Sequence, residues 1–333
     1  MAIDQQTYLR SELERRQTRL QSALAFAPAD DSFSSLLGQV DAALARMDEG
    51  TYGLCVVCHD PIEEERLIAD PLVRFCLDDL SQDERRALES DLTLAARIQQ
   101  ALLPSPKFAP RGWQVAFHSA PASLVSGDYC DLFECKGGFV FLLGDVSGKG
   151  VAASMLMSHL HATFRSLAET DLTLDQIVAA ANRVFAESTL AGQYATLVVG
   201  RVSHDGVVEF VSAGHLPFLH LCGTGPLVKD ATGVPLGMFT DARFPVGRMV
   251  LAPGEALLLY TDGVTESQNT AGEEYGIARV KDLARQCCKA LPKELISECL
   301  SDLGRFSSGT KPTDDLTLLA IQRTAPGGAG LVV

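Results

Sequence analysis

Four short motifs beyond residue 125 place an aspartate beside a glycine or a second aspartate, each next to an apolar run that is typical of a β-strand. They are Ser126-Gly-Asp128, Gly144-Asp-Val-Ser-Gly148, Thr261-Asp-Gly263 and Thr313-Asp-Asp-Leu-Thr317. A single aspartate beside a glycine at a strand end is usually a turn residue. Four of them on rigid strand ends can converge on hard divalent cations, which prefer oxygen ligands. The sequence therefore predicts a Mg²⁺ or Mn²⁺ site.

Three cysteines have the spacing of a second kind of metal site. Two residues separate Cys55 from Cys58, seventeen separate Cys58 from Cys76, and Asp79 follows three positions later. This spacing is typical of a four-coordinate zinc site, here with aspartate in the last position. We expect one Zn²⁺ held by the three cysteines and Asp79, with His59 as an alternative fourth ligand.

Apolar periodicity predicts the elements in the first third of the chain. Two helical segments separated by a turn predict a helical hairpin over 1–50, followed by the cysteine module over 51–82. A linker helix is expected over 83–104. Its apolar stripe either packs on the chain's own domain or forms a short parallel homodimer seam. The stripe consists of Leu88, Leu92, Ala95, Ile98 and Leu102.

Beyond the linker, short β-like runs alternate with helical segments, which predicts an α+β domain over 105–325 with helices packed on sheets. A glycine-rich flexible tail is expected over 326–333. The predicted strands cover 113–117, 139–143, 194–202, 207–211, 256–260 and 316–321, and the predicted helices cover 151–167, 174–189, 277–288 and 291–306.

The aspartate motifs and the segments between them resemble, in order, the RsbU/SpoIIE branch of the PPM protein phosphatases. The resemblance covers about residues 95–323. It rests on Ala96-Arg-Ile-Gln99 with Leu102-Leu-Pro104, Ser126-Gly-Asp-Tyr-Cys-Asp131, Gly144-Asp-Val-Ser-Gly-Lys-Gly150, Ala213-Gly-His-Leu-Pro217, Thr261-Asp-Gly263 and Asp314-Asp-Leu-Thr317. It implies an αββα sandwich, two central sheets flanked by helices, with two Mn²⁺ or Mg²⁺ ions at one edge.

The resemblance also implies the metal ligands. By motif position, Asp145 corresponds to the carboxylate that bridges both ions, and the Val146 carbonyl to a backbone ligand. Asp128 corresponds to a ligand of one ion, and Asp262 and Asp314 to ligands of the other. The expected activity is hydrolysis of phosphoserine or phosphothreonine in a protein by a water between the two ions, without a protein nucleophile.

Other residues near the motifs are expected to play supporting parts. Asp131 and Asp315 are expected to orient metal-bound water, because such waters need hydrogen-bond acceptors. His215 is expected to form structural hydrogen bonds rather than to act as an acid. Lys149 is expected to be a solvated surface residue. Cys299 lies six positions before an arginine, as in thiol-dependent phosphatases, but on a predicted helix, so this spacing is interpreted as chance.

Residues 35–80 resemble the TraR/DksA zinc-finger family, on the cysteine spacing and its flanking residues. Members of that family bind RNA polymerase through an acidic-tipped hairpin, and Asp30 and Asp31 lie at the corresponding turn. This implies an alternative function as a transcription regulator. The preferred hypothesis is that the hairpin and finger regulate the phosphatase through the linker helix.

Bulk composition restricts the partners and the compartment. With 47% hydrophobic and 21% charged residues, the chain is expected to fold. Its net charge of -14 argues against binding to nucleic acid or to an anionic membrane. The absence of a signal peptide or a long apolar run predicts a cytoplasmic protein. Family resemblance implies that the substrate is a phosphorylated STAS-domain anti-sigma-factor antagonist.

Overall fold

The computed structural model describes residues 3–26, 31–77, 82–189, 192–310 and 312–324. The chain divides into two compact units, Met1–Asp91 and Leu92–Val333, which are described separately here. The boundary lies inside α4 (Gln82–Leu102), the helix that the sequence predicts as a linker. The expected tail over 326–333 lies outside the described residues.

The first unit contains a helical hairpin followed by the cysteine segment. Its helices α1 (Ile3–Phe26) and α2 (Asp31–Asp48) run antiparallel, because Arg10 near the start of α1 forms a 2.7 Å ion pair with Asp48 at the end of α2. A short helix, α3 (Glu64–Ala69), follows the first two cysteines. The core of this unit consists of Leu9, Leu13, Leu20, Val40, Ala43, Met47, Tyr52, Cys55, Ile62, Leu67 and Cys76.

The second unit is built around two antiparallel five-stranded sheets. One has the strand order β1-β10-β9-β6-β7 and the other the order β2-β3-β4-β5-β8. The strands are β1 (Trp113–Ala120), β2 (Asp128–Cys135), β3 (Gly138–Val146), β4 (Ala195–Ser203), β5 (Val207–Ala213), β6 (Phe218–Cys222), β7 (Gly225–Lys229), β8 (Gly247–Val250), β9 (Ala256–Tyr260) and β10 (Leu316–Arg323).

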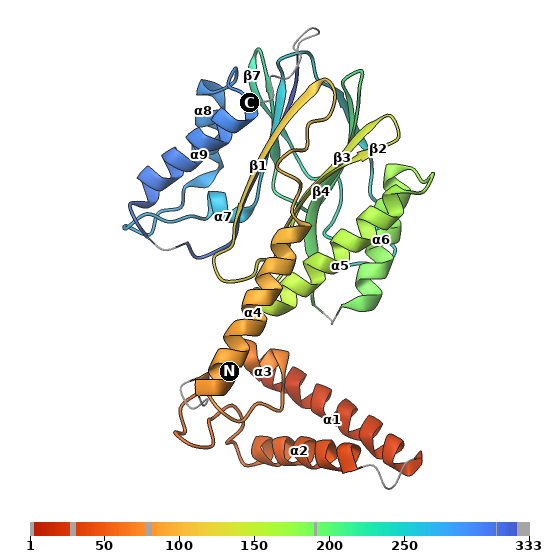
Figure 1. The fold of residues 1–333 in the computed structure, drawn as a ribbon, viewed down its shortest axis with the longest axis vertical. Helices are drawn as coiled ribbons and strands as arrows, with labels where there is room; N and C mark the ends of the chain where they lie inside the picture. Colours follow the sequence, from red (N-terminus) through yellow and green to blue (C-terminus); the bar gives the residue numbers. More distant parts are fainter. Residues whose placement is uncertain (1–2, 27–30, 78–81, 190–191, 311, 325–333) are drawn as a thin grey trace. The chain divides into compact units, whose positions relative to one another are not determined.

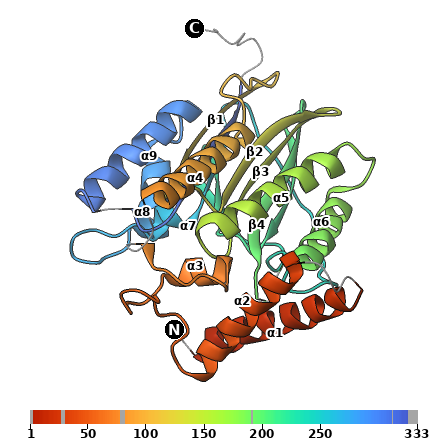
Figure 2. The same ribbon diagram turned by 60° about the horizontal axis from the view of Figure 1, so that its bottom comes forward.

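Helices cover the outer faces of both sheets (Figure 1). On the sheet that contains β3 lie α5 (Gly150–Ala168) and α6 (Leu174–Ser188), which Figure 2 shows side by side. On the other sheet lie α8 (Gly276–Gln286) and α9 (Pro292–Ser307), and a single turn, α7 (Asp262–Thr265), follows β9. This is the predicted αββα sandwich. None of the helices in the described parts of the chain is long and apolar enough to cross a bilayer.

The apolar run in β3 explains how the layers are held together. Phe139, Phe141 and Leu143 face the layer between the two sheets, whereas Val140 and Leu142 face the layer under α5 and α6. Side chains alternate between the faces of a strand, so a strand that is buried on both sides has a continuous apolar sequence. A third apolar layer lies between the other sheet and α8 and α9.

Strand register brings the acidic motifs to strand ends. Asp128 at the start of β2 is paired directly with Asp145 near the end of β3. Asp262 directly follows β9, and Asp314 lies two residues before β10. Because β9 and β10 are antiparallel neighbours, the end of one and the start of the other meet at the same edge of the sheet.

Candidate active site

Asp128 links the two sheets at this edge and is only 3% exposed. Its Oδ2 accepts hydrogen bonds from the hydroxyls of Thr261, at 2.9 Å, and Thr317, at 2.5 Å. Its buried Oδ1 has no hydrogen-bond partner among the described residues. Burial, with a contribution from the Asp145 carboxylate, raises the pKa of Asp128 well above its usual range. A buried carboxylate oxygen without a partner is costly, so this atom fits a cation ligand.

Asp145 and Asp262 lie in the same acidic environment. Burial, followed by repulsion from Asp262, Asp314 and Asp315, raises the pKa of Asp145 to about 7. Burial and then the Asp314 carboxylate raise the pKa of Asp262. Carboxylates that raise one another's pKa are stabilised in the ionised form by a cation between them. We call Asp128, Asp145, Asp262 and Asp314 the acidic cluster.

The two neighbouring aspartates before β10 have different partners. Asp315 accepts hydrogen bonds from the backbone N–H groups of Ala122, at 2.8 Å, and Gly127, at 2.7 Å. It therefore fixes the segment that leads into β2 and to Asp128. Asp314 accepts the N–H of Asp315 at Oδ1, at 2.9 Å, and its Oδ2 lies 2.8 Å from the ammonium of Lys149. Lys149 therefore contacts the site rather than only solvent.

Gly263 allows the loop that carries Asp262 to pack closely against the backbone of Asp315. A Cβ atom added at Gly263 would lie 1.9 Å from the carbonyl oxygen of Asp315, which is a severe clash with backbone. Only glycine leaves room for the two loops to pack. The Thr-Asp-Gly motif therefore needs its glycine for this close approach.

Asp131 has partners other than those expected from the sequence. It is fully buried, and Arg165 on α5 donates to both of its oxygens, at 2.7 and 2.8 Å. The imidazole of His161 is 3.4 Å away, and the hydroxyl of Tyr129 is also 3.4 Å away. Asp131 follows Asp128 by three residues, so the two side chains point to opposite faces of β2. Its contacts join β2 to α5 and do not reach the acidic cluster.

Gln99 on α4 is a supporting residue to which the sequence reasoning assigned no role, although it belongs to one of the family motifs. It is 9% exposed, its Nε2 donates to the carbonyl of Ser126 at 2.6 Å, and its Oε1 accepts the N–H of Ser126 at 2.9 Å. Thr261 and Thr317, which donate to Asp128, likewise belong to two of the aspartate motifs, and the sequence alone indicated no role for them. In each case the motif was visible, but the partner is set by tertiary structure.

His215 has the expected structural role. Its Nε2 lies 3.1 Å from the carbonyl oxygen of Tyr260, which can only accept, so Nε2 carries the proton. Its Nδ1 then accepts from the hydroxyl of Thr196, at 3.0 Å. Burial lowers the pKa of His215 to about 4. The imidazole is therefore neutral near pH 7 and joins β4 to the end of β9.

The side chains of the acidic cluster are not gathered as closely as those of Cys55, Cys58 and Cys76. Outside the cysteines, no three potential ligand atoms from different His, Cys, Asp or Glu side chains lie within 4.8 Å of one another in the described chain. Two-metal sites spread their ligands around ions about 3.5–4 Å apart. The partnerless Oδ1 of Asp128 and the mutual repulsion of the carboxylates are the features that such ions would relieve.

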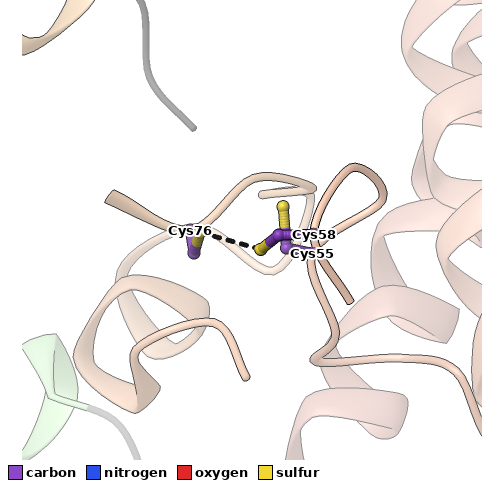
Figure 3. Close-up of side chains that lie close together, drawn as sticks. All are labelled: Cys55, Cys58 and Cys76. Carbon is purple, nitrogen blue, oxygen red and sulfur yellow. Dashed lines mark hydrogen bonds between the residues drawn. The ribbon is translucent and has the colours of Figure 1, made fainter. Parts of the chain in front are cut away.

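The cysteine cluster has the composition of a zinc site. The sulfur atoms of Cys55, Cys58 and Cys76 all lie within 4.8 Å of one another, and those of Cys58 and Cys76 are 3.5 Å apart (Figure 3). Asp79, the expected fourth ligand, lies outside the described residues. His59, the alternative, is exposed and is not part of this group.

The sandwich with its acidic edge has the PP2C-type phosphatase fold. It is similar to the SiaA-PP2C domain of Pseudomonas aeruginosa, with a TM-score of 0.63 and 19% identity over 72% of this chain and 98% of that domain. The chain belongs to the stage II sporulation protein E (SpoIIE) family, whose match covers residues 136–324. Residues 50–78 match the prokaryotic dksA/traR C4-type zinc finger. Both predicted resemblances are confirmed.

Two relatives are more similar in sequence. The phosphoserine phosphatase RsbU of Bacillus subtilis is 27% identical over 247 residues, which cover 72% of each chain. The structure of the RsbU and RsbW domains of Rv1364c from Mycobacterium tuberculosis has a TM-score of 0.57 and 33% identity, over 65% of this chain and 61% of that chain.

Proposed function

We propose that this protein is a metal-dependent protein serine/threonine phosphatase. The observation that carries the proposal is the acidic cluster, in which a buried carboxylate oxygen of Asp128 has no partner among the residues that the structure describes, and the pKa of Asp145 is raised to about 7. Membership of the SpoIIE family and similarity to a phosphoserine phosphatase support the same activity.

The proposed ligands are the acidic cluster and one backbone oxygen. Asp145 would serve both ions, Asp128 one of them, and Asp262 with Asp314 the other, while the Val146 carbonyl would be a backbone ligand. Two Mn²⁺ or Mg²⁺ ions bound there would supply a water of lowered pKa as the nucleophile and neutralise charge on the phosphoryl group. The chain itself orients the ligands, because two threonine hydroxyls fix Oδ2 of Asp128 and leave Oδ1 available.

The surrounding residues argue against a protein nucleophile or a histidine acid. His215 uses both ring nitrogens in hydrogen bonds and has a pKa lowered to about 4 by burial. Cys299 lies on α9, is 6% exposed, and has a pKa raised to about 12, mainly by burial. A thiol with such a pKa is not a thiolate at neutral pH.

The test is hydrolysis of p-nitrophenyl phosphate and of a phosphoserine peptide, with Mn²⁺ and with EDTA. We expect turnover with Mn²⁺ that is lost in Asp145→Asn and kept in Cys299→Ser. Turnover that persists in EDTA, or that depends on Cys299, would refute the metal-dependent mechanism.

We further propose that the cysteine cluster binds one Zn²⁺, with Asp79 as the fourth ligand. Three convergent thiol groups match the ligand set of structural zinc sites. Zinc content of the purified wild type and of Asp79→Ala, measured by plasma emission, tests both parts of this assignment.

The N-terminal unit is proposed to regulate the phosphatase through α4. This helix runs continuously from Gln82 to Leu102, and Gln99 on it holds the backbone of Ser126, two residues before Asp128. A shift of α4 would therefore move a proposed metal ligand. Gln99→Ala is expected to lower activity and to weaken the response to removal of residues 1–81.

Membership of the SpoIIE family supports a proposal for the partners. We propose a phosphorylated protein substrate in a partner-switching pathway, with a STAS-domain anti-sigma-factor antagonist as the specific candidate. A homodimer through α4 remains a prediction, to be checked by sedimentation; Ile98 in the predicted seam is 55% exposed. The comparisons favour the phosphatase function over RNA polymerase binding. The acidic hairpin tip expected to bind the polymerase lies largely outside the described residues.

A further inference from the structure

Lys149, which the sequence analysis expects to be a solvated surface residue, contacts the acidic cluster instead. Its ammonium lies 2.8 Å from Oδ2 of Asp314 and donates to the carbonyl oxygen of Thr313 at 2.7 Å. Among the described residues, it is the only Lys, Arg or His side chain in an ion pair with the acidic cluster. Lys149 therefore connects the loop after β3 to the segment before β10.

Each oxygen of the Asp314 carboxylate has a partner in this arrangement. Its Oδ1 accepts the N–H of Asp315, at 2.9 Å, and its Oδ2 faces Lys149. The first bond is local and joins adjacent residues, whereas the second joins two separate loops. Of the two partners, the ammonium is the one that can leave without rearrangement of the backbone.

Exposure and backbone geometry allow water to replace the ion pair between Lys149 and Asp314. Its side chain is 60% exposed and that of Asp314 is 32% exposed, so water can replace either partner. Lys149 lies between Gly148 and Gly150, which have φ values of +97° and +74°, a conformation that other residues rarely adopt. The tight turn aims the lysine at Asp314, and its flexible side chain can withdraw.

We propose that Lys149 is a built-in counter-cation of Asp314 that competes with a divalent ion for its Oδ2. This inference rests on the proposed metal site. Lys149 then lowers the affinity of the ion bound through Asp314, both because the ion pair must break and because its charge repels a second cation.

The experiment is Mn²⁺ binding by isothermal titration calorimetry to the full chain. It compares the wild type with Lys149→Met, which removes the charge but keeps the length, and with Lys149→Arg, which keeps the charge. Lys136→Met is the matched control, because Lys136 is in the turn before β3, at the opposite end of that strand from Asp145. Thermal melting of each variant in EDTA checks that it folds.

We expect the Mn²⁺ dissociation constant of the weaker class of sites to fall by about 1.5- to 5-fold in Lys149→Met, the range that a partly exposed ion pair gives. Lys149→Arg and Lys136→Met should not tighten binding. An unchanged or larger constant in a folded Lys149→Met, or equal tightening in Lys136→Met, would overturn the proposal. Absence of Mn²⁺ binding in the wild type would overturn the proposed metal site, and this inference with it.

Discussion

Acid should destabilise the sandwich through His215, and the structure gives the size of the effect. The imidazole is 4% exposed and joins Thr196 on β4 to the carbonyl oxygen of Tyr260, two positions before Asp262. Burial lowers its pKa to about 4, from the 6.5 of an exposed histidine. The folded protein therefore keeps His215 neutral, whereas the unfolded chain binds a proton below pH 6.5.

The sign and the magnitude follow from this difference in pKa. Because the unfolded state binds more protons, stability falls as pH decreases through 6.5 toward 4. At 1.36 kcal/mol per pKa unit, the full loss is about 3 kcal/mol, and about 2 kcal/mol of it is reached at pH 5. His215→Gln retains a donor and an acceptor but cannot titrate in this range.

The assay is urea unfolding at pH 7.5 and pH 5.0 in EDTA, followed by fluorescence of Trp113. This is the only tryptophan of the chain and is buried between the two sheets, so it reports on the sandwich alone. Comparing the wild type with His215→Gln at both pH values cancels the titration of the other groups. On going from pH 7.5 to pH 5.0, the unfolding free energy of His215→Gln should rise by about 2 kcal/mol relative to that of the wild type. If the difference in unfolding free energy between the two proteins changes by less than about 0.5 kcal/mol, burial does not lower the pKa of His215 as argued.

Three other substitutions test separate parts of the structure. Arg165→Met removes the two hydrogen bonds that a part-exposed guanidinium donates to the fully buried Asp131, and should lower the unfolding free energy by about 2 kcal/mol in urea titrations, whereas a loss below about 1 kcal/mol would contradict this role. Thr317→Val removes a hydrogen bond to Asp128 and should raise the Mn²⁺ concentration for half-maximal activity about tenfold; an unchanged Mn²⁺ titration would count against this. Cys58→Ser should lower the zinc content by at least about half, measured by plasma emission, unless the wild type purifies without zinc.

The sequence predicted strands best where both faces of the strand are apolar. The predicted runs over 139–143 and 256–260 lie in β3 and β9, whose side chains alternate between two buried layers. β2 was not among the predicted runs, because it carries Asp131 and Glu134 among its apolar residues. The charge of Asp131 is compensated by Arg165, which lies 34 positions away, so no local pattern could indicate it.

The candidate site was predictable as a set of motifs but not as a set of contacts. The glycine of Thr261-Asp-Gly263 and the aspartates stood out by type and spacing, and the structure places the acidic cluster at neighbouring strand ends. The partners of Asp315 and Lys149 depend on loops that are brought together only by the packing of the two sheets. Such contacts have sequence separations of 164 to 193 residues.

One rule would have separated the aspartates that face the site from those that hold the fold. Asp128 and Asp131 are three residues apart in a strand, so they cannot point to the same face. One lies at the acidic cluster, and the other binds α5 through Arg165. The adjacent pair Asp314 and Asp315 divides in the same way, with one carboxylate facing Lys149 and the other fixing backbone N–H groups. In each pair, the second aspartate fixes the strand or loop on which the first depends.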